Sequence, residues 1–374
     1  MNLETQLNDL PDAEAAAFRE VVGRLRDMPR REPSADLVGR ILASVADERG
    51  RARVPDARTN GWKCRVPWRV VAGLAAGFVA VVTFLALREP AASMDNELAW
   101  LAACQESDGS WNPARHGGDP SYRPALTALA ALALSRESAR HAECVERACD
   151  ALAALQTADG AFGGSGRVQA YNHAITTYAL AALGSHRPRV GAALERAVVF
   201  SESRQSAEGG WDYESGSEGN AAVTAWQVRA LACAAEQGVD GANMPLRKGL
   251  RWLRGAARDD GSVAYHRGSG ARSEGLSALT AHALMTSGKS FPGLSALGQR
   301  VAASLGADPG SGGGADCYRD YAKVLAFESA GEGGRANAVR GGMQERRQAG
   351  GHDQWESVGG ALYTQTFAAL VAKR

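Results

Sequence analysis

One short phrase returns four times along this chain at nearly constant spacing. It reads Gln-Glu-Ser-Asp-Gly-Ser-Trp from residue 105, and its later copies begin at residues 156, 205 and 257. The acidic residue of each copy falls at 108, 159, 208 and 260, so the period is about 50 residues. A repeat of this size indicates stacked supersecondary units that each pack against their neighbours. The repeat therefore constrains the fold of most of the chain.

The residues of the phrase have the chemistry of a tight turn. Asp-Gly supplies a sharp reversal, a Gln side chain can satisfy free backbone groups at a helix terminus, and the aromatic residue can cover its own hairpin. The acidic pair Asp259-Asp260 belongs to the fourth, weaker copy of this turn. We therefore interpret the motif as structural rather than catalytic, with these residues as its staples: Gln105, Asp108, Gly109, Trp111, Gln156, Asp159, Gly160, Phe162, Gln205, Gly209, Trp211 and Gly261.

Helical patterns lie on both sides of the turns. Alanine-rich runs with apolar residues three and four apart cover 122–135, 170–183, 221–236, 273–287, 316–330 and 358–372. More highly charged helices precede the turns, for example at 96–104, 141–155, 190–204 and 245–256. Because the first set is apolar nearly all round, we expect it to be buried as an inner ring. The sequence predicts an all-α fold, an α/α toroid of six helical hairpins over residues 95–374, with an open α-solenoid as the alternative.

A long apolar segment precedes the repeats. Residues 70–87 contain a single polar side chain, Thr83, and a helix of this length spans ~27 Å, close to the thickness of a hydrocarbon core. The segment begins too far from the N-terminus for a signal peptide. It also lacks the polar face that a core helix of a soluble domain would have. We predict a transmembrane helix over 70–87, with the lipid bilayer as its partner.

Charges beside this segment predict its orientation. Basic residues are frequent before it, whereas acidic residues follow it, and the basic side of a span stays in the cytoplasm. We therefore expect a single-pass membrane protein. Its parts are a cytoplasmic helical segment (1–50), a basic juxtamembrane linker (51–69) and a toroid (95–374) that lies outside, in the periplasm if the cell has two membranes.

The remaining composition bears on partners. The formal net charge is +1, which disfavours a nucleic-acid surface. None of the six cysteines has zinc-finger spacing, so neither a metal nor a cofactor is expected. Residues 1–50 favour two short helices, at 13–26 and 34–47, which could bind a cytoplasmic protein partner through an amphipathic face. A solvated tail with nascent helices is the alternative.

The turn motif resembles that of a known family. The Gln-x-x-Asp-Gly-x-Trp phrase in hairpins of about 50 residues is similar to the repeat of squalene/terpene cyclases and protein prenyltransferase β-subunits, over residues 95–374. More narrowly, four segments resemble a group of uncharacterised bacterial membrane-anchored toroid proteins, for which no reaction is known. These segments are 169–174, 210–213 with 223–228, 316–321 and 359–364.

The catalytic residues of the larger families do not carry over. The Asp-x-Asp-Asp acid of the cyclases is absent from the sequence. The prenyltransferase zinc site needs an Asp two residues before a Cys, but Ala315 stands there before Cys317, and Tyr363 is the best match to the zinc-binding His. The resemblance therefore implies the toroid fold and its lumen, without either family activity.

The mouth of a toroid is rimmed by the turns and by the N-termini of the inner helices, which carry partial positive charge. Polar and aromatic residues near those ends are the candidate ligand-binding residues: Tyr171, His173, Trp226, Gln227, Arg319, Tyr321 and Tyr363. Candidate catalytic residues are His173, Asp316 and Asp320, the two aspartates as possible lumen acids. Each has a simpler interpretation: a satisfied core histidine, plain aromatic packing, or aspartates paired with arginines.

Three functions remain open at this stage. The first is a non-catalytic toroid that binds an apolar or peptide-like ligand in its lumen, which the missing catalytic residues favour. The second is an enzyme that acts on isoprenoid-type substrates through a lumen acid. The third is a transmembrane signalling scaffold with a cytoplasmic partner, which can coexist with the first.

Overall fold

The computed structural model describes residues 94–184, 186–270, 273–288, 291–306, 315–350 and 353–372. The chain divides into two compact units, 1–80 and 81–374, and every described residue lies in the second. The predicted span 70–87 and the predicted helices within 1–50 lie outside the described residues. Among the helices that are described, none has the length and apolarity needed to cross a membrane.

The described part is helical, with isolated β-bridges but no strands. Its α-helices form six pairs, in each of which an outer helix precedes an inner one. The pairs are α5 (Met94–Ala103) with α6 (Arg123–Leu134), α7 (Ser138–Ala154) with α8 (Gly166–Leu183), α9 (Pro188–Ser203) with α10 (Ala221–Glu236), α11 (Asn243–Ala256) with α12 (Glu274–Ser287), α13 (Leu294–Ser304) with α14 (Cys317–Ser329), and α15 (Gly333–Gln348) with α16 (Glu356–Val371). Short 3₁₀ helices lie at η1 (Pro113–His116), η2 (Pro120–Tyr122) and η3 (Ser135–Glu137).

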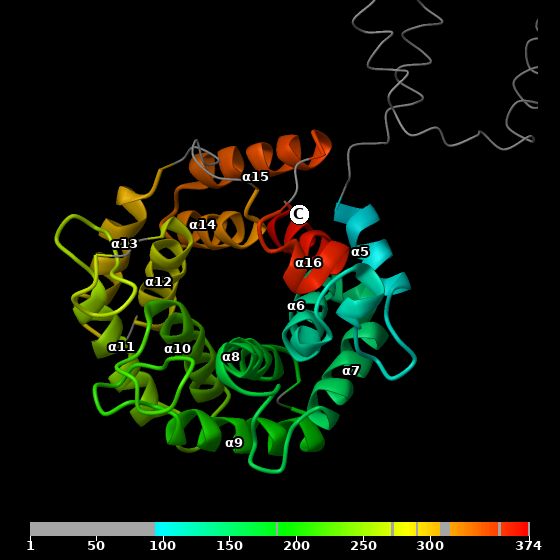
Figure 1. Ribbon diagram of the computed structural model, residues 1–374, viewed down its shortest axis with the longest axis horizontal. Coiled ribbons are helices and arrows are strands. Elements are labelled where there is room, and N and C mark those ends of the chain that lie inside the picture. Colours follow the sequence, from blue (N-terminus) through cyan, green and yellow to red (C-terminus); the bar gives the residue numbers. More distant parts are fainter. Residues whose placement is uncertain are drawn as a thin grey trace, which may run out of the picture. The chain divides into compact units, whose positions relative to one another are not determined.

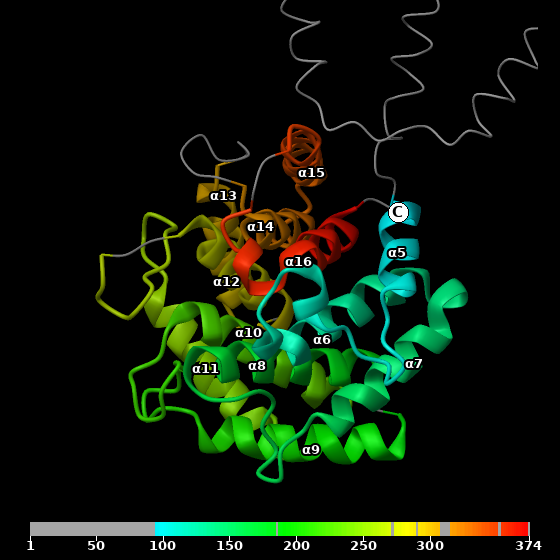
Figure 2. The same cartoon turned by 45° about the vertical axis from the view of Figure 1, so that its right-hand side comes forward.

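The inner helices close into a ring. Each of α6, α8, α10, α12, α14 and α16 packs against the next, and α16 packs back on α6. Figure 1 shows this inner ring with the other helices arranged outside it, and Figure 2 shows α7 and α9 on the outside of α6 and α8. The predicted α/α toroid of six hairpins is confirmed, and the open solenoid is excluded.

Alanine explains why the inner helices can pack so closely. Fully buried alanines occur on every inner helix, among them Ala128, Ala179, Ala225, Ala278, Ala322 and Ala369. Small side chains let neighbouring helix axes approach, and they lose little conformational entropy on burial. The inner helices can therefore pack closely around the ring.

The Gln of the turn motif joins consecutive hairpins. Gln156 Nε2 donates to Gly160 O within its own turn (3.1 Å) and to Ala193 O in α9, the outer helix of the next hairpin (2.7 Å). Gln105 and Gln205 make the same pair of bonds one repeat earlier and one repeat later. The turn is thus a clamp between repeats as well as a reversal of the chain.

The turn glycines are required for two reasons. Their φ angles are +86°, +89° and +95° at positions 109, 160 and 209, a region that other residues rarely adopt. A Cβ there would also meet a backbone carbonyl oxygen of the next outer helix at 2.4 to 2.7 Å. The three contacts are Gly109 to Arg147, Gly160 to Arg196, and Gly209 to Lys248.

The motif tryptophans anchor each turn inside its own hairpin. Trp111 Nε1 donates to Leu101 O at the end of α5 (2.8 Å), and its backbone N–H donates to Thr127 Oγ1 of α6 (3.0 Å). Trp211 repeats both bonds with Ser201 and Thr224. Both indoles are buried. One aromatic residue therefore fixes the turn to the outer and the inner helix at once.

The ring is closed at a seam between the last and first hairpins. Helix α16 packs against α5 as well as α6. Arg136, just after α6, donates to the carbonyl oxygens of Leu370 and Ala372 at the end of α16. Glu97 of α5 forms an ion pair with Arg347 of α15. These contacts join the two ends of the toroid.

Candidate functional site

A cavity of about 110 Å³ lies in the lumen, enclosed by α6, α8, α14 and α16. Residues at the starts of the inner helices border it, so it lies toward the end of the ring where those helices begin. Its lining is almost entirely aromatic or aliphatic: Tyr122, Ala125, Leu126, Leu129, Arg167, Tyr171, Ile175, Tyr318, Trp355, Val358, Tyr363 and Phe367. An apolar cavity of about 150 Å³ can hold benzene, so this one has room for a small apolar group.

Two of the predicted ligand-binding residues line the cavity directly. Tyr171 lies on the second turn of α8, and Tyr363 lies in α16 with its ring 4.7 Å from that of Phe367. Burial raises the pKa of both phenols well above the ordinary value, so both hydroxyls stay protonated. They are neutral walls of the cavity.

Aromatic rings from three inner helices form the floor of this cavity. Trp226 Nε1 of α10 donates to the Tyr318 hydroxyl of α14 (3.0 Å). The Trp226 ring stacks on Tyr321 at 6.4 Å and 15°, and Tyr321 lies 5.2 Å from Phe367 of α16. The predicted candidates Trp226 and Tyr321 therefore lie behind two lining residues, Tyr318 and Phe367, and do not line the cavity themselves.

A buried arginine lies beside this floor. Arg229 of α10 is 4% exposed, and its Cζ is 4.4 Å from the ring centroids of both Tyr178 and Trp226. One of its amino groups is 3.4 Å from the Tyr321 hydroxyl. Burial lowers the pKa of a guanidinium, but Tyr321 and Tyr178 outweigh burial here and the pKa of Arg229 is raised. Sequence reasoning missed Arg229, although it is the one charged residue of α10 before the terminal Glu236.

A second arginine lies at the mouth. Arg167 follows the glycine-rich stretch 163–166 and is the second residue of α8. Its Cζ is 5.1 Å from the Trp355 ring, next to α16, and 5.9 Å from the Tyr213 ring, in the loop before α10. Helix α6 lies between α8 and α16 in the ring, so this exposed side chain reaches across part of the mouth.

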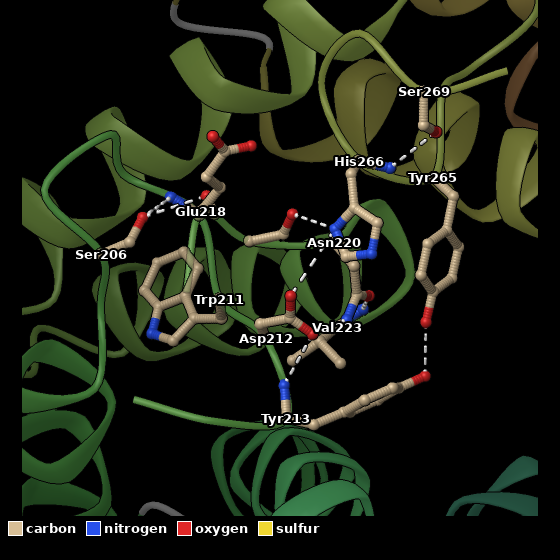
Figure 3. A network of polar contacts seen from close by, with 12 residues as sticks. Ser206, Trp211, Asp212, Tyr213, Glu218, Asn220, Val223, Tyr265, His266 and Ser269 are labelled. Carbon is tan, nitrogen blue, oxygen red and sulfur yellow. Dashed lines mark hydrogen bonds and ion pairs between the residues drawn. The ribbon is translucent and has the colours of Figure 1, made fainter. Parts of the chain in front are cut away.

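Polar contacts join two loops of the rim beside α10 and α12 (Figure 3). The hydroxyls of Tyr213 and Tyr265 are 2.6 Å apart. Asp212 accepts from the Tyr213 N–H (2.8 Å) and from Asn220 Nδ2 (2.5 Å), and its other oxygen is 3.6 Å from His266 Nδ1. The network fixes the loops that carry Tyr213 and Tyr265 at the mouth.

His173 and Gln227 do not line this cavity; they border a smaller pocket together with Asp212 and Tyr213. His173 Nε2 is 2.9 Å from Ser201 Oγ of α9, and Ser201 donates to Gln227 Oε1 (3.0 Å). The His173 ring also lies 4.7 Å from that of Phe200, and burial lowers the pKa of His173 to about 3. Side chains two residues apart differ by about 200° around an α-helix axis, so His173 points away from the lumen that Tyr171 lines.

The predicted lumen acids are also held elsewhere. Asp316 caps α14 by accepting from the Arg319 N–H (2.8 Å), and Gln354 donates to its second oxygen. Asp320 is 1% exposed and forms ion pairs with Arg346 of α15 and with Arg319. Burial raises the pKa of both carboxyls. Neither of them lines the cavity, and neither does Arg319.

The residues around Cys317 do not fit the zinc site of prenyltransferases. The Cys317 backbone N–H donates to Asp353 Oδ2 (2.7 Å), and burial raises the pKa of the thiol further above its ordinary value. Tyr363, at the position matched to a zinc-binding His, is a protonated phenol that lines the cavity. Within the described residues, no group of three His, Cys, Asp or Glu side chains could hold a metal ion.

Comparison with known proteins agrees with the fold. The family model of the prenyltransferase alpha-alpha toroid domain matches residues 30–212 and 179–287. No curated protein matches the sequence.

Among solved structures, one similar chain is an inactive variant of the alpha-1,6-mannanase GH76A of Salegentibacter sp. HEL1_6, in complex with alpha-1,6-mannotriose. Its TM-score is 0.55 at 11% identity, over 75% of this chain and 96% of that chain. A protein from Actinoplanes gives a TM-score of 0.50 at 14% identity, over 75% and 97% of the two chains. At such identities the likeness shows the fold alone. The resemblance to terpene cyclases thus stands at the level of the toroid, which mannanases share.

Proposed function

This chain belongs to the prenyltransferase alpha-alpha toroid domain family, and from that membership and the geometry of its lumen we propose that it is a binding protein for one small apolar ligand. The lumen cavity is the binding site, and the protein acts by capturing and holding the ligand rather than by transforming it. A peptide-like ligand would enter through an apolar side chain of matching size.

The lining of the cavity is the observation that carries this proposal. Eleven of its twelve residues are aromatic or aliphatic, and the only charged one, Arg167, lies at the mouth. A concave site with mostly apolar walls and few polar groups is the usual form of a small-molecule site. The phenols of Tyr171 and Tyr363 remain neutral, which suits an uncharged apolar body.

The same lining argues against catalysis. Glycoside hydrolysis needs two carboxylates that flank the scissile bond, and protonation of an alkene needs at least one acid beside it. No carboxylate is among the described residues that line the cavity. We therefore do not extend the mannan substrate of the similar mannanases to this protein.

Filling the cavity tests the proposal. Fluorobenzene binding to the full-length protein in lipid nanodiscs can be followed by ¹⁹F NMR, with empty nanodiscs as the reference. Ile175→Phe places a ring in the cavity and should abolish the bound signal. Val199→Phe adds the same ring on the exposed face of α9, where Val199 is 65% exposed, and should leave binding intact. Equal binding by the two variants would show that fluorobenzene does not occupy the lumen.

We also propose that the toroid is tethered to a membrane through residues 70–87. The apolar run and the charge difference across it support this, with 1–69 in the cytoplasm and 95–374 outside. Protease added to sealed right-side-out vesicles should digest residues 95–374 and spare an epitope placed at the N-terminus. Digestion of the epitope in intact vesicles would show that the protein has the opposite orientation.

Residues 1–50 could connect ligand binding outside to a protein partner in the cytoplasm. Their predicted amphipathic helices support such a docking segment. A pull-down with the full-length protein and with a variant lacking residues 1–50 should recover the partner only with the former. Recovery with both would mean that another part of the chain binds it.

A further inference from the structure

Arg229 differs from the other deeply buried cations of the described chain. Lys323, which is fully buried, has a carboxylate partner in Glu274 at 3.0 Å. No ion pair with a carboxylate is formed by Arg229 among the described residues. Its Nη1 is buried and has no hydrogen-bond partner. A buried charge without a counter-charge is unfavourable unless something compensates it.

The neighbours of Arg229 compensate only part of this charge. The rings of Tyr178 and Trp226 face the guanidinium, and the Tyr321 hydroxyl meets its second amino group. The two ring centroids are 6.3 Å apart, so the guanidinium lies in a corner between tilted rings rather than between parallel faces. His282 of α12 carries no charge, since burial and Arg229 lower its pKa to about 3 and keep it neutral.

The position of Arg229 places this charge under the ligand cavity. Helix side chains lean toward the N-terminus of their helix, so the guanidinium rises from α10 toward the end where the cavity lies. Trp226 and Tyr321, which contact it, also contact Tyr318 and Phe367, whose rings border the cavity. Trp226 and Tyr321 do not line the cavity themselves, so they and the lining rings of Tyr318 and Phe367 lie between Arg229 and the ligand space.

We propose that the lumen ligand is a small carboxylate whose apolar body fills the cavity and whose carboxylate pairs with Arg229 Nη1. The inference rests on the proposed binding function and names the chemical class of its ligand. Rotation of the Tyr318 or Tyr321 ring would open the floor to the head group. The ligand then supplies the counter-charge that Arg229 lacks.

A monoanion fits this site better than a phosphate. One guanidinium balances one negative charge, whereas a phosphate monoester carries close to two at neutral pH. The other nearby arginine, Arg136, is close enough for its charge to lower the pKa of Tyr321. However, it already donates to two carbonyl oxygens at the end of α16. The second charge of a phosphate would therefore stay uncompensated.

The test compares three ligands that share a phenyl ring on the full-length protein in nanodiscs: benzoate, benzyl alcohol and phenyl phosphate. Titration calorimetry should show benzoate binding about tenfold tighter than the neutral alcohol. In Arg229→Met, which keeps the length of the side chain without its charge, benzoate should lose this advantage while the alcohol binds as before. Arg251→Met, at an exposed position of α11, is the matched control and should leave all three affinities unchanged.

The outcomes separate the two proposals. If benzoate binds no tighter than benzyl alcohol to the natural protein, the role of Arg229 is wrong while the apolar cavity stands. Tighter binding of phenyl phosphate would replace the carboxylate with a phosphate as the ligand class. If none of the three binds, the proposed function fails together with this inference. Even if Arg229→Met does not fold, the affinities of the three ligands for the natural protein are enough to support or overturn the carboxylate proposal.

Discussion

Side chains of the inner helices are divided between two environments, the lumen and the layer between the rings. Tyr171 lines the cavity, whereas His173 lies in the layer beside Ser201. Trp226 contributes to the floor of the lumen, and the adjacent Gln227 bonds to that same Ser201. In both α8 and α10, one face therefore borders the lumen and another packs in the layer between the rings.

The buried histidine predicts a dependence of stability on pH. The pKa of His173 falls from about 6.5 in the unfolded chain to about 3 in the fold, so only the unfolded state binds a proton between these values. The share of stability that depends on neutral His173 is therefore complete well above pH 6.5 and is lost as the pH falls, by about 2 kcal/mol at pH 5. His282, whose pKa is also lowered to about 3, adds a loss of its own. Urea unfolding at pH 7 and pH 5 measures the sum of the two.

Replacement of the histidine should reduce that slope. His173→Gln removes the titrating group, so the difference between pH 7 and pH 5 should shrink by about 2 kcal/mol even though the variant is less stable throughout. His186→Gln changes an exposed loop histidine and controls for the substitution itself. An unchanged slope in His173→Gln would mean that His173 is not buried in its neutral form.

Asp320 is predicted to be structural. It is almost fully buried against Arg346 and Arg319, and removal of one charge from a buried pair leaves the other uncompensated. Asp320→Asn should therefore lower the free energy of unfolding by ~3 kcal/mol. Glu195→Gln, on the exposed face of α9, should change it by less than about 0.5 kcal/mol. A stable Asp320→Asn variant would reopen a role for this carboxylate beyond the ion pairs.

It was easier to predict from the sequence which residue types form the site than to predict which way each side chain faces. Tyr171 and Tyr363 were found because aromatic residues near inner-helix starts tend to border a lumen. The facing of His173 and Gln227 was not found, because a helix that is apolar all round gives no periodicity to orient it. Arg229 and Trp355 were missed because their importance depends on neighbours that are remote in sequence: Tyr178, Tyr321 and Arg167.

At the scale of elements, the turns hold the hairpins together. Gly160 has a φ of +89°, and a Cβ there would lie 2.5 Å from Arg196 O of α9. Gly268 has a similar φ of +84° but nothing within 4 Å. The two positions share backbone strain, and only the first also faces a neighbouring helix.

Alanine substitutions separate these two effects. Gly268→Ala should cost about 1 kcal/mol, from the left-handed backbone alone. Gly160→Ala should cost at least ~2 kcal/mol more, because the Cβ must displace the backbone of α9. Urea unfolding of both variants measures the difference. Equal costs would show that α9 moves aside freely and that the clamp is loose.

The elements were predictable where the turn motif was present. The predicted 221–236 coincides with α10, and the other motif-bounded helices differ from the structure by a few residues. Helices α13 and α15 received no bounds from the sequence, because the motif is degenerate or absent there and α15 is rich in glycine and charge. The kink at Gly360 was not visible either, since it arises where His116 of η1 approaches α16.

At the scale of the whole toroid, the seam is expected to be its weakest joint. Three copies of the turn clamp join the first four hairpins, whereas the contacts between the last and first hairpins include the ion pair of Glu97 with Arg347 and a backbone hydrogen bond from Asp119 to Val358. Burial raises the pKa of Glu97 against the opposing effect of Arg347, so its charge depends on that partner.

Loss of this ion pair should open the seam first. In Glu97→Gln, hydrogen exchange should speed up about tenfold in α5, α15 and α16, while α9 and α11 exchange as before. Mass spectrometry of peptic peptides from the full-length protein resolves these helices. Uniformly faster exchange in all of them would mean that the ring unfolds as one unit and has no weak joint.

Because the ring is closed, the chain could begin at any of the six hairpins and still form the same toroid. Because α16 packs against α5 and α6, a short link could join them and the chain could be cut at another turn instead. Such circular permutants would keep every helix contact of the ring while moving the two chain ends to another turn. A family built this way can acquire a new attachment point without redesigning its interior.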